Sequence, residues 1–305
     1  MNIFYLINNC KIIGLGEFSH GINESWKLRF DILKEAIKKT NKKIIIFNEF
    51  SDWMADNIMN NTYFYKDKSG KWKKGKYNGI KIENSHDNSP NPSFGKYWQY
   101  MHHGAESKLF LQIIKYIRKH KDRITIYGFD EEKYGLARDY PFYREICKKY
   151  NPKAIHFLWM HNSHIDDRKL DMINYKYTKK EHPNWKHYCG HYLKKKFGKK
   201  YCILLTQAYK GIHRFNGYCI GKNCEKRIYQ LKYIYKSFIN KKAKKYVDKK
   251  KPVQWLKKYD SPFMEFSNSY FTSNKYGSYK LKNYNKYDYI VFFNKVSSPK
   301  ALCDY

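Results

Sequence analysis

In Lys11-Ile-Ile-Gly-Leu-Gly-Glu-Phe-Ser-His-Gly21, an apolar run passes directly into a segment rich in glycine. Residues 11–15 have the length and apolar character of a buried β-strand. The glycines let the backbone turn sharply after that strand. Apolar residues then recur at helical spacing at Ile22, Trp26, Phe30, Leu33 and Ile37. The sequence therefore predicts a strand, a tight turn and a helix over 22–39.

Five further apolar runs repeat this strand pattern. They are Lys43–Phe47, Arg123–Tyr127, Ala154–Trp159, Tyr201–Leu205 and Tyr289–Phe293. Helical spacing recurs over 109–117, 138–149 and 187–197. Short apolar strands that alternate with helices are typical of a parallel sheet covered on both faces. We therefore predict an α/β fold with a mostly parallel central sheet flanked by helices.

The chain reads as a single α/β domain over residues 1–305. Apolar residues make up 42% of the sequence, which is enough to build a large core. Two segments, at about 60–100 and 225–286, are polar, rich in lysine and without clear apolar periodicity. We expect these two segments to form polar excursions from the main body.

The formal net charge of +34 raises the hypothesis of a nucleic-acid or polyanion partner, because cationic side chains neutralise phosphates. The charge comes from 53 lysines and only 8 arginines, whereas readers of bases and phosphates favour arginine. The chain is also rich in Asn, Ile, Tyr and Phe, residues with AT-rich codons. A biased genome therefore explains the lysine excess as well as a ligand does, and both readings stay open.

The seven cysteines are scattered and odd in number, and only Cys219 and Cys224 lie close together. This pattern predicts reduced thiols, with Cys10 and Cys202 simply packed beside buried strands. The first ten residues resemble neither a signal peptide nor a membrane anchor. No apolar run reaches the length needed to span a bilayer. We therefore expect a soluble, cytoplasmic protein without a membrane partner.

Ionisable side chains follow four of the expected strands, at the point where each strand ends. They are Glu17 and His20, Glu49, Asp130, and His161 and His164. Ligand sites of parallel sheets lie outside the carboxyl ends of the strands, so these groups converge on one edge. Such a cluster is typical of a general-base hydrolase site or of a metal site. A bound divalent metal is left open.

At each motif a purely structural role is an alternative to the catalytic one. Ser19 could cap the following helix, and His20 could simply cover its first turn. Ser19 is a weak candidate nucleophile, because the first glycine of the G-x-S-x-G turn is missing. His161 and His164 suit a metal pair or two donors to a developing oxyanion, yet a histidine pair of this spacing is often a surface feature.

The landmarks of the chain, taken in order, resemble the erythromycin esterase family. The match runs through Gly14-x-Gly16-Glu17-x-x-His20-Gly21, Arg29, Glu49, Tyr127-Gly-Phe-Asp130, Arg138-Asp139, Trp159-Met-His-Asn-Ser-His164, Gly190-His-Tyr-Leu193 and Tyr287-Asp-Tyr-Ile-Val-Phe-Phe293. The resemblance covers most of the chain. It implies hydrolysis of an ester or lactone by an activated water, without an acyl-enzyme.

On the matching positions the resemblance also implies roles for the catalytic groups. His20 would be the base that activates water, and Glu17 and Glu49 would orient it and tune its pKa. His161 and His164 would bind substrate or stabilise the tetrahedral oxyanion.

The same resemblance implies a set of substrate-binding residues: Arg29, Asn162 and Asp130. Where the family usually has a long helical excursion, only a few residues separate Asp130 from Arg138. This reduced helical lid implies a more open cleft and a substrate other than a macrolide. Two alternatives remain beside the esterase: a polyanion-binding protein on a catalytically degenerate fold, and a metal-dependent hydrolase of another class.

Overall fold

An eight-stranded sheet forms the centre of the molecule, with the order β5-β2-β6-β1-β7-β12-β9 and with β8 paired to β7. The computed structural model describes residues 3–18, 22–50, 52–60, 62–66, 72–76, 108–129, 138–167, 169–170, 179, 182–217, 232–239, 244, 246–257, 264–265, 279–280 and 288–297. The strands of the sheet are β1 (Ile12–Glu17), β2 (Ile44–Asn48), β5 (Ile124–Gly128), β6 (Ile155–His161), β7 (Tyr201–Gly217), β8 (Lys232–Ile239), β9 (Val253–Lys257) and β12 (Tyr289–Val296).

The strands from β5 to β12 in this order are parallel, and β8 and β9 are antiparallel to their neighbours. All six strands that the apolar runs predict are present in the sheet. The predicted α/β fold with a mostly parallel central sheet is therefore confirmed.

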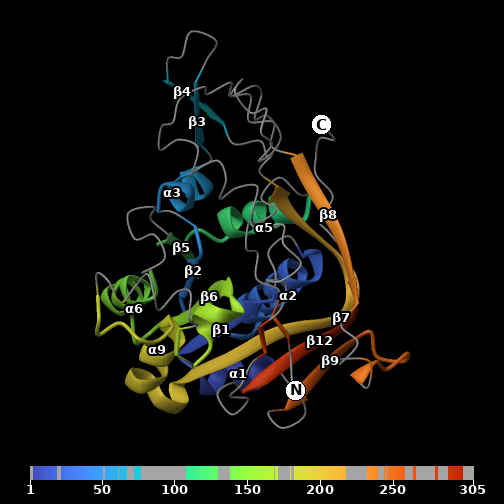
Figure 1. The fold of residues 1–305 in the computed structure, drawn as a ribbon. Helices are drawn as coiled ribbons and strands as arrows, with labels where there is room; N and C mark the ends of the chain where they lie inside the picture. The colour runs from blue at the N-terminus through green and yellow to red at the C-terminus, as the bar shows by residue number, and fades with distance from the viewer. Residues whose placement is uncertain are drawn as a thin grey trace.

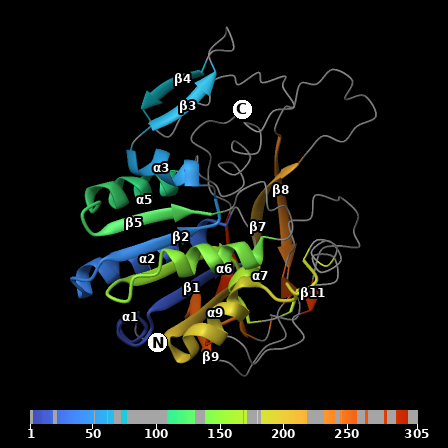
Figure 2. The same cartoon turned by 90° about the vertical axis from the view of Figure 1, so that its left-hand side faces the viewer.

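Helices cover both faces of the sheet (Figures 1 and 2). One core contains residues of α1 (Ile3–Asn9), α2 (Asn23–Lys39), α3 (Asp52–Asn60) and α5 (Lys108–Lys119), and the other contains residues of α6 (Asp139–Lys148), α7 (Asn162–Ile165) and α9 (Cys189–Phe197). Successive strand residues alternate between the two cores, as the pleat requires: Ile44 and Ile46 join the first, and Ile45 and Phe47 the second.

The segment 225–286 differs from the expectation of a polar excursion, since it contributes β8 and β9 to the central sheet. Strand β9 pairs through its backbone with β12 and lies at an edge, so it needs no continuous apolar run. Within the segment 60–100, β3 (Thr62–Lys66) and β4 (Trp72–Lys76) form a separate two-stranded sheet. A second small sheet pairs β10 (Met264–Glu265) with β11 (Tyr279–Lys280). The expected shortened lid between Asp130 and Arg138 lies outside the described residues.

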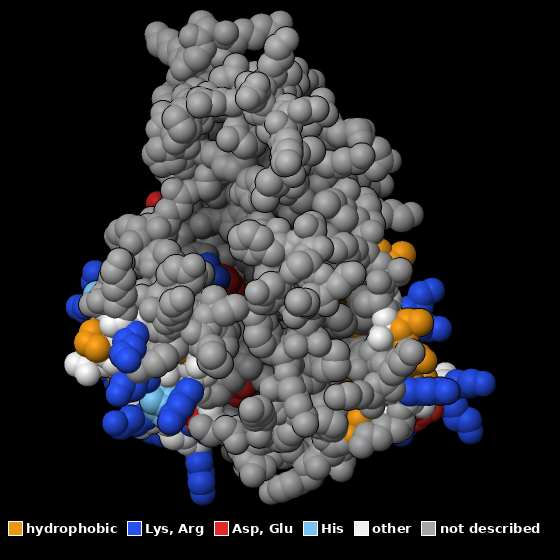
Figure 3. Space-filling model, in the orientation of Figure 1, with side chains coloured by type: hydrophobic (Ala, Val, Ile, Leu, Met, Phe, Trp, Pro, Cys, Tyr) orange, Lys and Arg blue, Asp and Glu red, His pale blue; other side chains and the backbone are white. Residues whose placement is uncertain are grey.

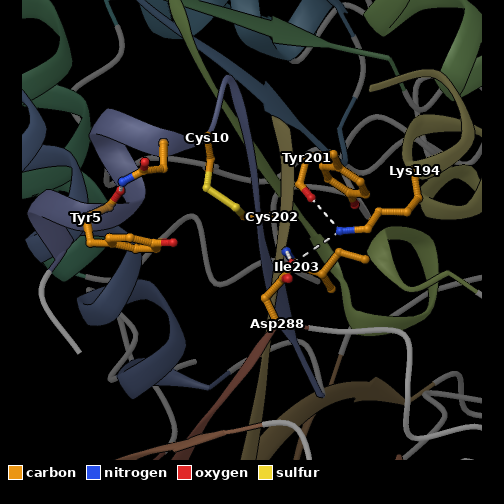
Figure 4. The surroundings of a disulfide bond; sticks show 8 residues. Tyr5, Cys10, Lys194, Tyr201, Cys202, Ile203 and Asp288 are labelled. Carbon is orange, nitrogen blue, oxygen red and sulfur yellow. Dashed lines mark hydrogen bonds and ion pairs between the residues drawn. A yellow bond between two sulfur atoms is a disulfide. The ribbon is translucent and has the colours of Figure 1, made fainter. Parts of the chain in front are cut away.

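The prediction of reduced thiols is wrong for one pair, because Cys10 and Cys202 form a disulfide (Figure 4). The Cα atoms of the two cysteines are 5.9 Å apart, a usual separation for such a bond. Cys10 lies between α1 and β1, and Cys202 lies on the neighbouring strand β7. The partners are 192 residues apart in sequence, so only the strand order brings them together. Cys147 and Cys189 are free thiols, as expected.

We expect this disulfide to stabilise the fold, because it closes a loop of 192 residues in the unfolded chain. Reduction, or the double substitution Cys10→Ala with Cys202→Ala, is expected to lower the free energy of unfolding by about 2–4 kcal/mol. Urea unfolding with and without dithiothreitol measures the change, and Cys147→Ala is the control. A wild-type midpoint that does not respond to dithiothreitol would contradict the prediction.

No helix in the described part of the chain combines the length and the apolar character needed to cross a membrane.

Candidate active site

The carboxyl ends of three neighbouring strands, β2, β6 and β1, carry most of the predicted site. Glu17 ends β1 and is the register partner of His161, which ends β6. Glu49 follows directly after β2, and its backbone N–H donates to the carbonyl of Trp159 on β6. The side chains of Glu17, Glu49 and His161 are all buried. The expected convergence of these groups on one sheet edge is therefore present.

Arg29 of α2 forms a buried ion pair with Glu17. The guanidinium Nη1 lies 3.2 Å from Glu17 Oε2, and both side chains are 1% exposed. The other guanidinium nitrogens donate to the carbonyls of Leu15 and Met160, at 3.0 and 2.9 Å for Nη2. Burial lowers the pKa of Arg29, while the nearby carboxylates of Glu17 and Glu49 act in the opposite direction. Arg29 thus joins α2 to the ends of β1 and β6.

Glu49 accepts hydrogen bonds on both carboxylate oxygens. Oε2 accepts from the backbone N–H of His161 at 2.7 Å. Oε1 lies 3.1 Å from His164 Nε2 and 3.3 Å from Arg138 Nη2. The Glu49 carboxylate therefore contacts the start of α7, His164 and Arg138 at the same time.

His164 lies between two carboxylates. Its Nδ1 is 2.8 Å from Asp139 Oδ1, and its Nε2 faces Glu49. Burial alone would lower the pKa of His164, but the carboxylates of Asp139 and Glu49 outweigh it and raise the pKa to about 10. The raised pKa favours the charged ring, whereas Arg138 Nη2, 3.2 Å from the same Nε2, only donates and therefore favours an unprotonated Nε2.

His161 and Asn162 link the site to the rest of the sheet. His161 Nδ1 accepts from the backbone N–H of Ser163 and caps α7, while Nε2 lies 3.3 Å from the carbonyl of Phe18. Asn162 exchanges two hydrogen bonds with the backbone of Thr206 on β7, at 2.9 and 3.2 Å. A Cβ atom at Gly16 would collide with the Asn162 side chain. The second glycine of the turn motif is thus needed for this close approach.

The side-chain amide of Asn162 joins α7 to β7. The substrate-binding role expected for Asn162 stays a prediction. Two functional candidates escaped the sequence argument, namely Arg138 and Asp139. The pair Arg138-Asp139 is one of the landmarks that resemble the erythromycin esterase family, and this resemblance was the available signal. His20 and Asp130 lie outside the described residues, as does Ser19, so their expected roles stay predictions.

Among the residues that the structure describes, no group of three or more His, Cys, Asp or Glu side chains could hold a metal ion. Figure 3 shows a hollow in one face of the molecule, and basic and acidic side chains are visible at its bottom. Arg138 is the most accessible of the charged groups described above. Its side chain is 26% exposed, whereas the side chain of its partner Glu49 is 2% exposed. Arg138 thus connects the buried charges with solvent.

Comparison by sequence finds no family model and no curated protein that matches this chain. Comparison by structure finds similar solved folds. A protein from Bacillus cereus has a TM-score of 0.60 at 11% identity, with 98% of this chain and 92% of that chain covered. A succinoglycan biosynthesis protein has a TM-score of 0.54 at 13% identity, with 96% and 90% covered.

An erythromycin esterase mutant, solved in its open conformation, has a TM-score of 0.58 at 10% identity. The alignment covers 99% of this chain and 94% of that chain. At these identities the likeness concerns the fold. The chain therefore shares the overall architecture of an erythromycin esterase over almost its whole length.

Proposed function

We propose that this protein is a hydrolase that cleaves an ester or lactone with an activated water molecule as the nucleophile. One observation carries the proposal. Three neighbouring strand ends deliver Glu17, Glu49 and His161 to a single buried edge, where Arg29 and His164 join them. The likeness in fold to an erythromycin esterase supports the same reaction class.

In the proposed reaction the described residues act on the carbonyl side of the bond. His164 and Arg138, which both contact Glu49, would stabilise the negative charge of a tetrahedral intermediate. Glu17, held by Arg29, would orient the base. The proton acceptor is assigned to His20 by its place in the sequence motif. The substrate is a small ester or lactone, and the shortened lid argues against a macrolide.

The number of covalent steps tests this proposal. The purified protein is mixed with a panel of p-nitrophenyl esters and aromatic lactones, and product release is followed in a stopped-flow instrument. Because water attacks directly, we expect steady release without a burst and no acyl adduct in the intact-protein mass.

The variant Ser19→Ala is the control for a serine nucleophile, and it is expected to keep wild-type turnover. A burst that matches the enzyme concentration and disappears in Ser19→Ala would contradict the water mechanism. A wild-type protein that hydrolyses no ester or lactone of the panel would contradict the reaction class.

A further inference from the structure

Positive charge is concentrated in the segments that run from the end of a helix into a parallel strand. Four such segments enter β2, β5, β6 and β7, and they are residues 38–43, 118–123, 148–153 and 194–200. Lys and Arg make up 16 of their 25 residues, against 61 of 305 in the whole chain, and Asp122 is their single acidic residue. A codon bias acts on the whole chain, so it does not account for this concentration.

The four segments lie side by side, because the strands that they enter follow one another in the order β5-β2-β6-β1-β7. The carbonyls of Arg123 and Lys43 accept hydrogen bonds from the first residues of β2 and β6, at 2.8 and 2.9 Å. Lys11, directly before β1, donates to the carbonyl of Lys200 at 2.8 Å. Neighbouring strands are about 4.8 Å apart, so the five strand starts span about 19 Å. We call the four segments, together with Lys11, the basic face.

Most of this charge reaches solvent without a partner of opposite sign. Ion pairs within the described residues hold two of the cations, Lys149 with Asp52 and Lys194 with Asp288. Each segment also has at least one exposed lysine that contacts no carboxylate of the described residues: Lys42, Lys121, Lys153 and Lys199. Like charges this close repel one another and destabilise the compact state. A bound polyanion would remove that repulsion.

The helix dipole explains one part of the pattern. A cation in the last turn of a helix stabilises the partial negative charge there, and α2, α5, α6 and α9 all have such residues. The effect falls off beyond that turn. It therefore does not explain Lys42, Lys43, Lys121 and Lys153, which follow the helix ends.

The opposite edge of the sheet differs in charge. The described residues that directly follow β1, β2, β5 and β6 contain no Lys or Arg, and they include Glu49, Asp166 and Asp167. Strands of five to seven residues place about 16–23 Å between the two edges. A partner on the basic face therefore leaves the candidate active site open.

We propose that the basic face is a docking surface for a nucleic-acid duplex, which it holds through the phosphates without reading the base sequence. A span of about 19 Å faces five or six phosphates of one strand, at about 3.4 Å per step. Lysine suits this task because it neutralises a phosphate as a point charge, whereas base readers favour the planar fork of arginine. The surface is separate from the proposed hydrolysis and does not depend on it.

An anionic membrane is the competing partner for such a surface. Stable attachment to a membrane takes a second signal besides a basic patch, such as apolar groups that enter the lipid. The large apolar side chains that are exposed in the described part of the chain are Tyr5, Ile212, Ile239 and Val253. None of them lies in the four segments, so the observations favour the nucleic acid.

Fluorescence anisotropy with a short labelled DNA duplex of mixed sequence tests the inference. Five or six neutralised phosphates predict a slope of about −5 for the logarithm of the binding constant against the logarithm of salt concentration. Between about 50 and 200 mM salt, affinity is then expected to fall by about 10³-fold. A duplex of unrelated sequence is expected to bind equally well.

Two variants that lose the same charge show where the duplex binds. The face variant combines Lys42→Gln, Lys121→Gln, Lys153→Gln and Lys199→Gln. The control variant combines Lys210→Gln, Lys249→Gln, Lys250→Gln and Lys295→Gln, exposed positions on β7 and β12 and before β9. At about 0.1 M salt the face variant is expected to bind at least about 100-fold more weakly than wild type, with a shallower salt slope. The control variant is expected to bind nearly as wild type.

All eight lysines are exposed, so both variants are expected to fold, which circular dichroism melts check. Equal weakening in the two variants would assign binding to the overall charge of +34 and overturn the inference. Binding to vesicles that contain phosphatidylserine, without binding to the duplex, would overturn it in favour of a membrane. Because these measurements need no ester substrate, a protein without esterase activity would reject the proposed function and leave the docking surface testable.

Discussion

Replacement of Arg29 by methionine is expected to lower the free energy of unfolding by about 3–5 kcal/mol, because it breaks a buried ion pair with the carboxylate of Glu17. The guanidinium is 1% exposed and donates to Glu17 and to two backbone carbonyls, those of Leu15 and Met160. Methionine fills a similar volume but donates no hydrogen bond. Water cannot replace the lost donors, since neither Glu17 nor the guanidinium site is open to solvent.

Two further variants test whether the loss of stability comes from the broken ion pair between Arg29 and Glu17. In Arg29→Met with Glu17→Gln, both charges are gone, and part of the stability is expected to return. The variant Lys27→Met removes the ion pair between Lys27 and Asp31 on the same helix. The side chain of Lys27 is 66% exposed. Such a pair contributes about 0–1 kcal/mol. Urea unfolding that gives the same small change for Arg29→Met and Lys27→Met would contradict the prediction.

The sequence predicted the sheet because apolar runs record burial directly. Residues 11–15 and the other five runs became strands of the central sheet, and in β2 and β7 successive residues alternate between the two cores. Parallel pairing then determined that Glu17 and His161, far apart in the chain, end adjacent strands in register. The site edge could be predicted for the same reason, since it depends only on which residue follows each strand.

Contacts between side chains of distant segments could not be predicted in this way. The disulfide of Cys10 with Cys202 depends on the strand order, which spacing does not reveal. Arg29 lies near Glu17 because α2 packs back on β1, whereas its place in the helical pattern gave no sign of that contact. Asp139 was read as part of a helix start, and its partner His164 comes from a different strand end.

Edge strands were also difficult to predict from the sequence. Strand β9 has one exposed apolar residue, Val253, and two half-buried ones, Trp255 and Leu256. Because it pairs with one neighbour in the sheet, its apolar pattern is weaker than that of β6, which is buried on both faces. Its lysine-rich surroundings resembled a polar excursion. Such strands are recognised from backbone pairing, which leaves little trace in composition.

Replacement of His20 by alanine is expected to lower kcat/KM for ester hydrolysis by a factor of about 10²–10⁴, the usual contribution of a general base. The argument starts from the two histidines that the structure describes in the site. His164 has Nδ1 engaged by Asp139 and Nε2 engaged by Glu49 and Arg138. His161 has Nδ1 engaged by Ser163 and Nε2 near the carbonyl of Phe18. Neither is ready to accept a proton from water, so the sequence motif assigns that step to His20.

The matched control is His120→Ala, at the carboxyl end of α5, which lies outside the proposed site and is expected to keep full activity. Circular dichroism melts should place both variants within about 1 kcal/mol of wild type. Added imidazole offers a stricter test, because a small base that enters the space left by the side chain can take the proton itself. Partial recovery of hydrolysis by His20→Ala, rising with imidazole concentration, would support a proton-transfer role. Full activity without imidazole would assign the base to another residue.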